Sequence, residues 1–460
     1  MVNNAPVVVS APGKVLLAGG YLVLDRAYTG LVFGLDARLH VLAQPISTST
    51  GVTLNEIVVN SPQFQGAVWE YGYRVTEQEG GIQVTQLRVD ADLNLNRNPF
   101  VETTLSYALS YISSVAKPTI TPASITILAD NDYYSTPSDL SNSSTTSPRF
   151  HVFDTPISKA HKTGLGSSAA LVTALTASLL TYYLPSDVID LSTESGKRKL
   201  HNLAQAAHCA AQGKVGSGFD VASAVYGSCL YRRFSPSILS SHTEPGRPEF
   251  GAQLKSIVNE TDIKWDHEIQ KNAVKVPQGM RLVMCDVSHG SQTPGLVKQV
   301  LMWRKHNAEE AGEIWDELHE HNTALADELK KAAEKSDQQY DQITEHFRTI
   351  RRLIREMSEK SDVPIEPPEQ TKLLDACDEI EGVVGGVVPG AGGYDAIAVL
   401  IRDDESTISA LRKLFSSWRF MSSEQGGEEA GGRVSMLGVR EEMEGVRAEQ
   451  ADAYKAWLQY

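Results

Sequence analysis

Apolar and polar residues alternate along the chain in blocks that predict a mixed α+β protein. Short runs rich in Val, Ile and aromatic residues predict strands at residues 53–61, 67–75, 124–128, 281–288 and 433–439. Apolar residues at helical spacing predict helices at residues 100–114, 200–212, 221–227 and 406–418. Two longer stretches, residues 7–24 and 383–401, each read as a strand, a Pro or Gly turn and a second strand.

The order of these blocks predicts two domains, residues 1–235 and residues 236–460. From residue 281 onward the order strand, helix, strand, strand, helix, strand is typical of a split βαβ unit. We expect a Ser/Thr/Pro-rich surface insertion at about residues 135–148 and a charged helical insertion at about residues 295–360. Residues 424–432 read as a flexible acidic loop.

The stretch KTGLGSSAALVTALTASLL, residues 162–180, carries no charge after Lys162. Its apolar part ends near Leu184 and is shorter than the roughly 20 residues that cross a bilayer. Thr and Ser residues also interrupt it, so a buried core helix is the better interpretation than a membrane span.

Glycines and serines stand directly before this predicted helix. The N-terminus of a helix exposes unpaired N–H groups and a partial positive charge, and glycines let a phosphate approach them closely. The simpler alternative is a serine N-cap with no ligand. A Walker A loop is excluded because no Gly-Lys pair of the chain is followed by Ser or Thr, as the motif requires. The spacing Gly164, Gly166, Ala169 still satisfies a loose dinucleotide fingerprint, so a nicotinamide enzyme stays an alternative here.

Composition narrows the function further. The 460 residues are 41% hydrophobic, which suffices for a sizeable core. A net charge of -15 without a basic block argues against nucleic acid as a partner. The four cysteines are too far apart for a CxxC pair and read as reduced, buried thiols. No secretory pattern opens the chain, so we expect a cytoplasmic protein without a membrane partner.

Three segments in order carry a family resemblance: APGKVLLAGGYLVLD at 11–25, KTGLGSSAA at 162–170 and VVPGAGGYDAIAVL at 387–400. Together they resemble the motifs of the GHMP small-molecule kinases and, among these, the fungal type of phosphomevalonate kinases. GKVGSGFDVASAVYGS at 213–228 and HGSQTPGLVKQVL at 289–301 add to the likeness. The resemblance implies a two-domain GHMP kinase fold, with a left-handed βαβ crossover in an N-terminal α+β domain and a ferredoxin-like C-terminal domain.

The resemblance also implies an activity, the phosphorylation of 5-phosphomevalonate to 5-diphosphomevalonate with ATP and Mg²⁺. Alternatives within the superfamily are mevalonate, homoserine and sugar kinases. A GHMP-like regulator that binds ligand without catalysis is a further alternative, against which the presence of both Lys14 and Asp220 argues. We expect a monomer or a weak dimer.

Residue roles are carried over from the family motifs. The catalytic residues are Lys14 and Asp220. ATP binding is assigned to Asn98, at the start of the helix that follows Pro99, and to Lys162, Gly164, Leu165, Gly166, Ser167, Ser168 and Ala169. Mg²⁺ is assigned to Ser167, Ser168 and Asp220. Substrate binding is assigned to Lys14, Tyr21, Ser217, Ser288, His289, Ser291, Gln292, Thr293, Gly392 and Gly393. The alternative for Asp220 is a plain N-cap of the helix at 221–227.

Two anions must meet in a protein of net charge -15, so the site needs local cations. The cationic candidates near the motifs are Lys14, Lys159, His161, Lys162, Lys214, His289 and Lys298. The chain departs from the mevalonate kinase branch at Cys209, where that branch has a metal-binding Glu, and thiols are poor magnesium ligands. It also has Gly19-Gly20-Tyr21 where that branch has Gly-Glu-His, which disfavours mevalonate as acceptor.

Overall fold

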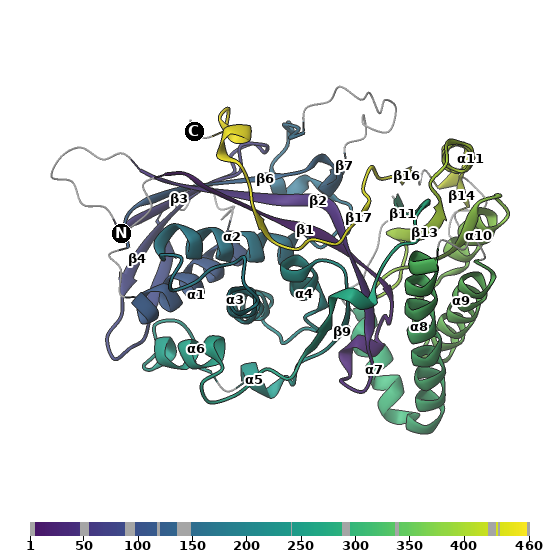
Figure 1. Cartoon of the computed structure of the whole chain (residues 1–460), viewed down its shortest axis with the longest axis horizontal. Coiled ribbons are helices and arrows are strands. Elements are labelled where there is room, and N and C mark those ends of the chain that lie inside the picture. The colour runs from purple at the N-terminus through teal and green to yellow at the C-terminus, as the bar shows by residue number, and fades with distance from the viewer. Residues whose placement is uncertain are drawn as a thin grey trace.

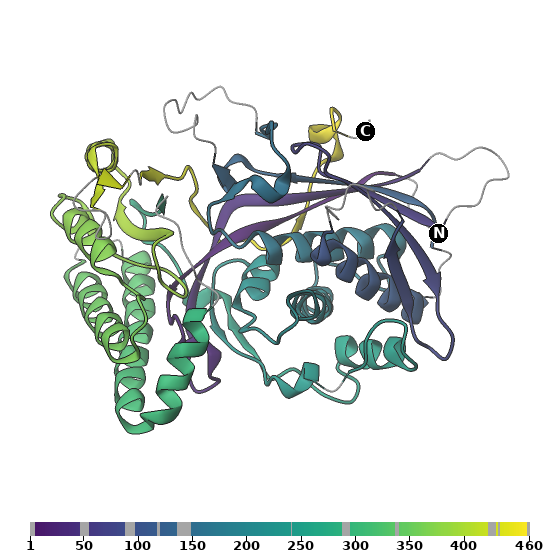
Figure 2. The same cartoon turned by 180° about the vertical axis from the view of Figure 1, so that it is seen from behind.

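The computed structural model describes ten segments of the chain: residues 5–46, 55–87, 97–116, 120–135, 149–240, 242–287, 295–335, 340–421, 429–430 and 433–457. These segments form two large sheets with helices and two small two-stranded sheets. The two large sheets and their helices lie side by side (Figures 1 and 2). The Ser-rich insertion beyond residue 135 and most of the acidic loop lie outside the described residues.

The first sheet is mixed and runs in the order β10-β9-β2-β6-β3-β4-β5, with β1 paired to β2. Its strands are β1 (Val7–Ala18), β2 (Gly30–Pro45), β3 (Glu56–Asn60), β4 (Val68–Val75), β5 (Ile82–Gln86), β6 (Ala123–Ala129), β9 (Cys229–Arg232) and β10 (Glu268–Gln270). Two short strands, β7 (Tyr134–Ser135) and β8 (His161–Lys162), pair with each other beside it.

The expected turn at Pro12-Gly13 is wrong. β1 runs through this position as one strand against β2, with a register shift between Pro12 and Gly13. The two extra residues at this shift, Asp36 and Ala37, lie on β2, so the bulge is in β2 and β1 continues past its proline. Gly13 lies close to another segment, since a Cβ there would lie 3.1 Å from the Leu165 carbonyl oxygen. The expected second strand, near Leu22, is a short 3-10 turn.

Helices cover one face of the first sheet (Figure 1). They are α1 (Pro99–Ala116), α2 (Ser167–Tyr183), α3 (Glu194–Gln212), α4 (Phe219–Tyr226), α5 (Ser237–Ser240) and α6 (Phe250–Asn259). α2 and α4 lie directly on β1 and β2, and α3 packs over them. α2 is buried along nearly its whole length, which confirms the core helix. Among the helices that the structure describes, none combines the length and apolar character needed to cross a membrane.

A crossover connection joins two parallel strands of this sheet. β3 and β6 pair in parallel, and the chain between them forms β4, β5 and α1. The left-handed sense expected for the crossover stays a prediction.

The second sheet has the order β12-β13-β11-β16, and its neighbouring strands are antiparallel. Its strands are β11 (Met280–Val287), β12 (Val383–Val387), β13 (Ala396–Arg402) and β16 (Val434–Met436). Taken in chain order, the first strand lies between the third and the fourth, which is the split βαβ pattern predicted from the sequence. A short pair, β14 (Phe420–Met421) and β15 (Glu429–Ala430), lies outside this sheet.

The helices of the second half are α7 (Leu296–His306), α8 (Ala308–Lys335), α9 (Asp341–Ser361), α10 (Pro368–Asp378) and α11 (Glu405–Ser417). α7, α8 and α9 occupy the charged stretch where a helical insertion was predicted. α8 and α9 pack along each other and stand beside the end of the first sheet (Figure 1).

The predicted domain boundary between residues 235 and 236 stays a prediction. In the structure, elements that follow residue 236 still belong to the first sheet and its helices. α6 packs on α1 and α3, and β10 pairs with β9, so both belong with the first sheet. The chain then returns to that sheet near its C-terminus, where β17 (Glu441–Glu442) pairs with β2 and β18 (Arg447–Ala448) pairs with β1. We call residues 441–449 the return segment.

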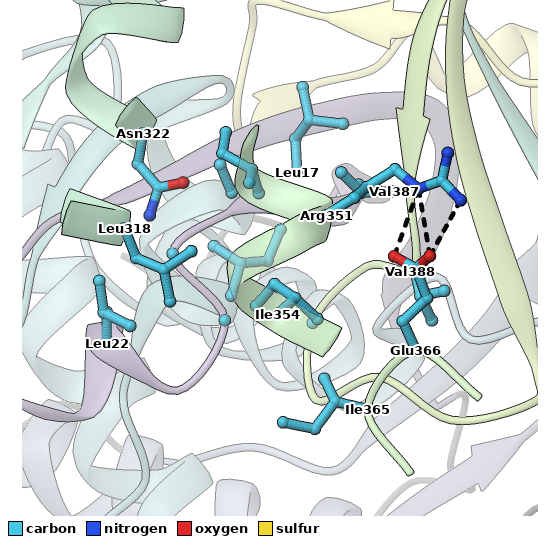
Figure 3. A pocket seen from close by; sticks show the side chains of 16 residues that line it. Leu17, Leu22, Leu318, Asn322, Arg351, Ile354, Ile365, Glu366, Val387 and Val388 are labelled. Carbon is cyan, nitrogen blue, oxygen red and sulfur yellow. Dashed lines mark hydrogen bonds and ion pairs between the residues drawn. The ribbon is translucent and has the colours of Figure 1, made fainter. Parts of the chain in front are cut away.

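A small cavity of about 20 Å³ marks the junction between the two halves (Figure 3). Leu17 and Leu22 line it from the first half, and Leu318, Asn322 and Ile354 line it from α8 and α9. Nearby, the Arg351 guanidinium turns to Glu366 and donates from Nη2 to Oε1 at 2.9 Å (Figure 3). Because the Arg351 guanidinium and the Glu366 carboxylate are both buried, the pair fixes α9 to the segment that precedes α10.

Candidate active site

The N-terminus of α2 is open to a ligand. Its N-cap residue is Gly166 with φ 79°, preceded by Gly164 with φ 78°, and both are left-handed values that glycine adopts without strain. A glycine has no side chain with which to cap a helix, so the serine-cap alternative is wrong. Ser167 and Ser168 occupy the first turn, where the backbone N–H groups have no intrahelical partner.

Lys14 lies against this loop. Its backbone N–H donates to the Leu165 carbonyl at 2.9 Å, and its Nζ donates to the Gly164 carbonyl at 3.3 Å. The contact is tight, because a Cβ on Gly166 would lie 2.8 Å from Lys14 Cε. β1 and the glycines of the loop together place an ammonium group beside the end of α2.

The charge of Lys14 depends on its surroundings. Burial lowers the pKa of the ammonium group, and the negative charge of Asp220 offsets part of this effect. The Phe219 ring centroid lies 5.8 Å from Lys14 Nζ. Anionic phosphates at this position would favour the charged form of the lysine.

Asp220 lies in the first turn of α4, on the other side of the candidate site. The N-cap of α4 is Gly218, with φ 89°, so the interpretation of Asp220 as an N-cap is wrong. Its Oδ1 accepts from the Val221 N–H at 3.0 Å. The loop before it is held by Tyr231, whose hydroxyl donates to the Ser217 carbonyl at 2.9 Å.

Arg233 also holds this loop, and sequence reasoning missed it. Its Nη2 donates to the carbonyls of Val215 and Gly216 at 3.0 and 2.8 Å, and Nη1 donates to the Leu24 carbonyl at 2.7 Å. The residue directly follows β9, and nothing in its sequence neighbourhood signals a contact with the loop at residues 215–216.

His208 on α3 is the second residue that sequence reasoning missed. Its Nε2 lies 3.1 Å from Ser168 Oγ, and its Nδ1 lies 3.8 Å from Asp220 Oδ2. The imidazole therefore stands between the first turn of α2 and the first turn of α4.

A pocket of about 90 Å³ opens beside the start of α2. Four of the residues that the sequence assigns to ATP line it, namely Asn98, Lys162, Ser167 and Ser168. Asn98 also caps α1, since its Oδ1 accepts from the Val101 N–H at 3.3 Å. The other lining residues are mostly apolar and were not predicted: Leu39, Ser61, Phe64, Trp69, Phe100, Ile127, Ala129, Tyr134, Ile157 and Leu171.

The Tyr21 loop meets the glycine turn of the second half. The Tyr21 hydroxyl donates to the Ala391 carbonyl at 2.6 Å, and the Gly390 N–H donates to the Leu16 carbonyl at 3.1 Å. Tyr21 has φ 64°, an unfavourable value for a residue with a side chain. Gly392 and Gly393 also have positive φ values, 78° and 106°. The structure thus brings together two segments that the sequence assigns to the substrate.

Part of the expected substrate side falls outside the described residues: Ser288, His289, Ser291, Gln292 and Thr293. The strand before them ends beside the α2 loop, since His161 Nε2 lies 3.5 Å from Asp286 Oδ2. Lys162 and Lys214 are exposed at the edge of the site.

Cys209 is buried and accepts a hydrogen bond from Gln205 Nε2 at 3.2 Å. Burial raises the pKa of its thiol, which keeps it neutral and unsuited to magnesium. All four cysteines are free and buried, as predicted. Within the described residues, no group of three or more His, Cys, Asp or Glu side chains is arranged to hold a metal ion.

The comparisons with known proteins identify the family of the chain. Models of the GHMP kinases N terminal domain and the GHMP kinases C terminal match residues 149–228 and 329–419. A phosphomevalonate kinase of Gibberella zeae is 54% identical over 460 residues, which cover 99% of each chain. The chain belongs to the phosphomevalonate kinases of the GHMP family. This membership removes the nicotinamide enzyme as an alternative.

Other members of this kinase family extend the match. The phosphomevalonate kinase of Aspergillus fumigatus is 48% identical over 98% of each chain. A protein of Arabidopsis thaliana named as a peroxisomal phosphomevalonate kinase is 32% identical over 97% of this chain and 96% of its own.

Solved structures confirm the two-domain fold of mixed α and β content. A Listeria innocua protein has a TM-score of 0.63 at 18% identity, covering 94% of this chain and all of that one. A Streptococcus pneumoniae phosphomevalonate kinase in complex with phosphomevalonate and AMPPNP has a TM-score of 0.57 at 16% identity, covering 93% of this chain and 100% of that one.

Proposed function

We propose that this chain transfers the γ-phosphoryl group of ATP to the phosphate of 5-phosphomevalonate, giving 5-diphosphomevalonate and ADP. The observation that carries the proposal is the open N-terminus of α2 with Lys14 against it, in a chain 54% identical over its length to a phosphomevalonate kinase. The other acceptors considered from sequence are weaker, because the full-length relatives named above share one substrate in their names.

The reaction needs little base catalysis. An oxygen of the acceptor phosphate forms a bond to the γ-phosphorus, while the bond from that phosphorus to the bridging oxygen breaks and ADP leaves with the electron pair. A phosphate monoester has its second pKa near ~6, so the attacking oxygen is already ionised at neutral pH. The protein's main tasks are to position two anions in line and to compensate their charge.

The N-terminus of α2 and Lys14 together compensate the negative charge of the two anions. The N–H groups of residues 166–168 offer fixed donors to the nucleotide phosphates, aided by the helix dipole. Lys14 adds a full positive charge beside the transferring group. We propose that the adenine base of ATP binds in the apolar and aromatic pocket that Trp69 and Phe100 line.

We assign Asp220 to orientation of the acceptor and of Lys14. The carboxylate is partly accessible, with 21% of its side chain exposed, and its charge supports that of Lys14. On the substrate side we propose Tyr21, Ser217, Gly392 and Gly393, with the predicted contribution of Ser288, His289, Ser291, Gln292 and Thr293.

The donor set fits a magnesium ion bound together with ATP. Ser167, Ser168 and Asp220 offer hydroxyl and carboxylate oxygens, and Mg²⁺ commonly takes one or two protein carboxylates plus substrate phosphates. When bound, the ion supplies charge compensation on the phosphates. Phosphate oxygens of the nucleotide and water would supply the remaining ligands, as Mg²⁺ commonly prefers.

We also retain the expectation of a cytoplasmic monomer or weak dimer. The Arabidopsis relative is named as peroxisomal, so localisation of a fluorescent fusion tests the compartment. Analytical ultracentrifugation tests the assembly state.

One assay decides the substrate. The purified protein is incubated with Mg²⁺, ATP and one of four acceptors (phosphomevalonate, mevalonate, homoserine or galactose), and ADP production is followed. We expect turnover with phosphomevalonate alone. Turnover with another acceptor and none with phosphomevalonate would contradict the proposal, and no turnover with any acceptor would favour a ligand-binding regulator.

A further inference from the structure

His208 has an unusual environment for a helix histidine. The residue is 2% exposed, yet both of its ring nitrogens face polar groups of the proposed active site. Its ring lies 5.8 Å from that of Phe100, which lines the nucleotide pocket. His201, two turns earlier on α3, is an ordinary core histidine: it packs on Tyr226 and Trp265, and its Nε2 is buried without a partner.

The contacts of His208 indicate where its proton lies. Gln212 Nε2 lies 3.3 Å from His208 Nε2, and an amide nitrogen only donates. With the amide in this orientation, His208 Nε2 is the unprotonated acceptor and the proton sits on Nδ1, facing Asp220. Ser168 Oγ, at 3.1 Å from Nε2, then also donates to the ring and shares the single lone pair of Nε2 with the Gln212 amide.

This arrangement fixes the direction of the Ser168 hydroxyl. With its hydrogen turned toward His208, the oxygen presents its lone pairs away from the imidazole, toward the open end of α2. The Nδ1–H group, at 3.8 Å from Asp220 Oδ2, is beyond hydrogen-bond distance but favours the carboxylate electrostatically. The His208 imidazole thereby acts on two oxygen atoms that could bind a metal ion, Ser168 Oγ on α2 and Asp220 Oδ2 on α4.

We infer that His208 is a positioning residue for the metal-bound nucleotide: it orients Ser168 and Asp220 so that their oxygens face the cation that accompanies ATP. The inference rests on the proposed function but assigns a role that the sequence motifs do not contain. His208 acts through its two neighbours, as do the partners that orient metal ligands in other proteins.

The test compares three variants with the wild type. His208→Ala removes both contacts. The His208→Gln side chain reaches toward Ser168 in the position of Nε2, whereas the His208→Asn side chain reaches only as far as Nδ1. Affinity for AMPPNP is measured by calorimetry with and without Mg²⁺, alongside kcat and KM in the phosphomevalonate assay. Thermal unfolding of each variant shows that it is folded.

We expect His208→Ala to lose about 10- to 100-fold in Mg²⁺-dependent nucleotide affinity or kcat, the usual range for such partners. Its magnesium-free affinity for AMPPNP should equal that of the wild type. His208→Gln should recover most of the loss and His208→Asn little of it. Ser168→Ala should lose a similar amount, and combining it with His208→Ala should add little, because the two residues form one contact.

Equal losses with and without Mg²⁺ would show that His208 only supports the fold, and wild-type values in His208→Ala would overturn the inference outright. A Gln variant no better than Ala would also contradict it. If the wild type fails to turn over phosphomevalonate, the proposed function fails, while the calorimetric comparison still decides the role of His208. If His208→Ala does not fold, His208→Gln against His208→Asn gives the comparison.

Discussion

At the scale of single residues, the site depends on a lysine whose charge the protein itself disfavours. Burial lowers the pKa of Lys14, and the carboxylate of Asp220 is what partly restores it. Under the proposed function, this group serves to bind anions and does not add stability. The ligand-free protein therefore carries a cost that bound phosphates remove.

Replacing Lys14 separates these two effects. We predict that Lys14→Met lowers kcat/KM about 10²- to 10³-fold, the range for loss of one group that stabilises developing charge. The midpoint of thermal unfolding without ligand should not fall. A variant with wild-type kcat/KM would contradict the assigned role.

The pKa shift also predicts a pH dependence of stability. Folded Lys14 binds a proton less readily than unfolded lysine, whose pKa is about 10.4. The free energy of unfolding therefore rises with pH between the folded and the unfolded pKa of Lys14. Urea denaturation at a series of alkaline pH values should show this rise in the wild type relative to Lys14→Met. Parallel curves for the two proteins would argue against the shift.

For Asp220 we predict that Asp220→Asn lowers kcat about 10²-fold or more while the protein stays folded. The amide keeps the shape and the Val221 contact but loses the charge that supports Lys14. Near-native kcat in this variant would remove Asp220 from the mechanism.

Residues with a motif could be predicted from the sequence, and residues without one could not. Lys14 and Asp220 follow glycines in recognisable segments, and the structure places both beside the α2 end. His208 and Arg233 reach the site only because α3 and β9 pass behind it, and neither residue stands in a spacing that indicates contact.

At the scale of elements, the sequence predicts most helices and strands, but it does not predict that β1 continues through Pro12. Pro12-Gly13 has the composition of a turn, but long-range pairing with β2 keeps β1 continuous there, and the bulge lies on β2 at Asp36 and Ala37. The Gly-Ser entry to α2 was predicted with two alternatives; the glycine N-cap excludes the serine cap, while phosphate binding there stays a prediction.

The two glycines of that entry form a matched pair for a test. Both have φ near 80°, so alanine at either position carries a similar backbone strain of about 1 kcal/mol. Only at Gly166 would the new Cβ meet Lys14, at 2.8 Å, while the space around Gly164 is empty within 4 Å.

We predict that both alanine variants lose similar stability in urea denaturation. Gly166→Ala should lose at least about 10-fold more kcat/KM for ATP than Gly164→Ala, because it displaces the lysine. Equal kinetics in the two variants would show that the approach of Lys14 to the loop is unimportant.

At the scale of the whole molecule, the return segment, near the C-terminus, adds two short strands to the first sheet. Arg38, 1% exposed, donates from Nη2 to the Gly445 carbonyl at 2.5 Å and lies 3.7 Å from Glu442 Oε2. Sequence reasoning placed this segment in the second domain. Its strands are two residues long, which is too short for a pattern of alternating apolar and polar residues to predict them from the sequence.

Gly445 presses this segment onto α4, the helix that carries Asp220. A Cβ at this position would lie 2.1 Å from the Val225 carbonyl oxygen, so backbone must move. We predict that Gly445→Ala lowers the free energy of unfolding by about 1–3 kcal/mol, the usual cost of overpacking. Gly295→Ala, with empty space around it, is the matched control. Equal stability of the two variants in urea would contradict the packing of the return segment on α4.

The most direct measurement is a crystal structure with an ATP analogue, Mg²⁺ and phosphomevalonate bound. We predict that the triphosphate lies on the N–H groups at the start of α2, with Lys14 Nζ beside the γ-phosphate and the acceptor phosphate facing it. A triphosphate bound elsewhere, away from residues 164–168, would contradict the proposed binding mode.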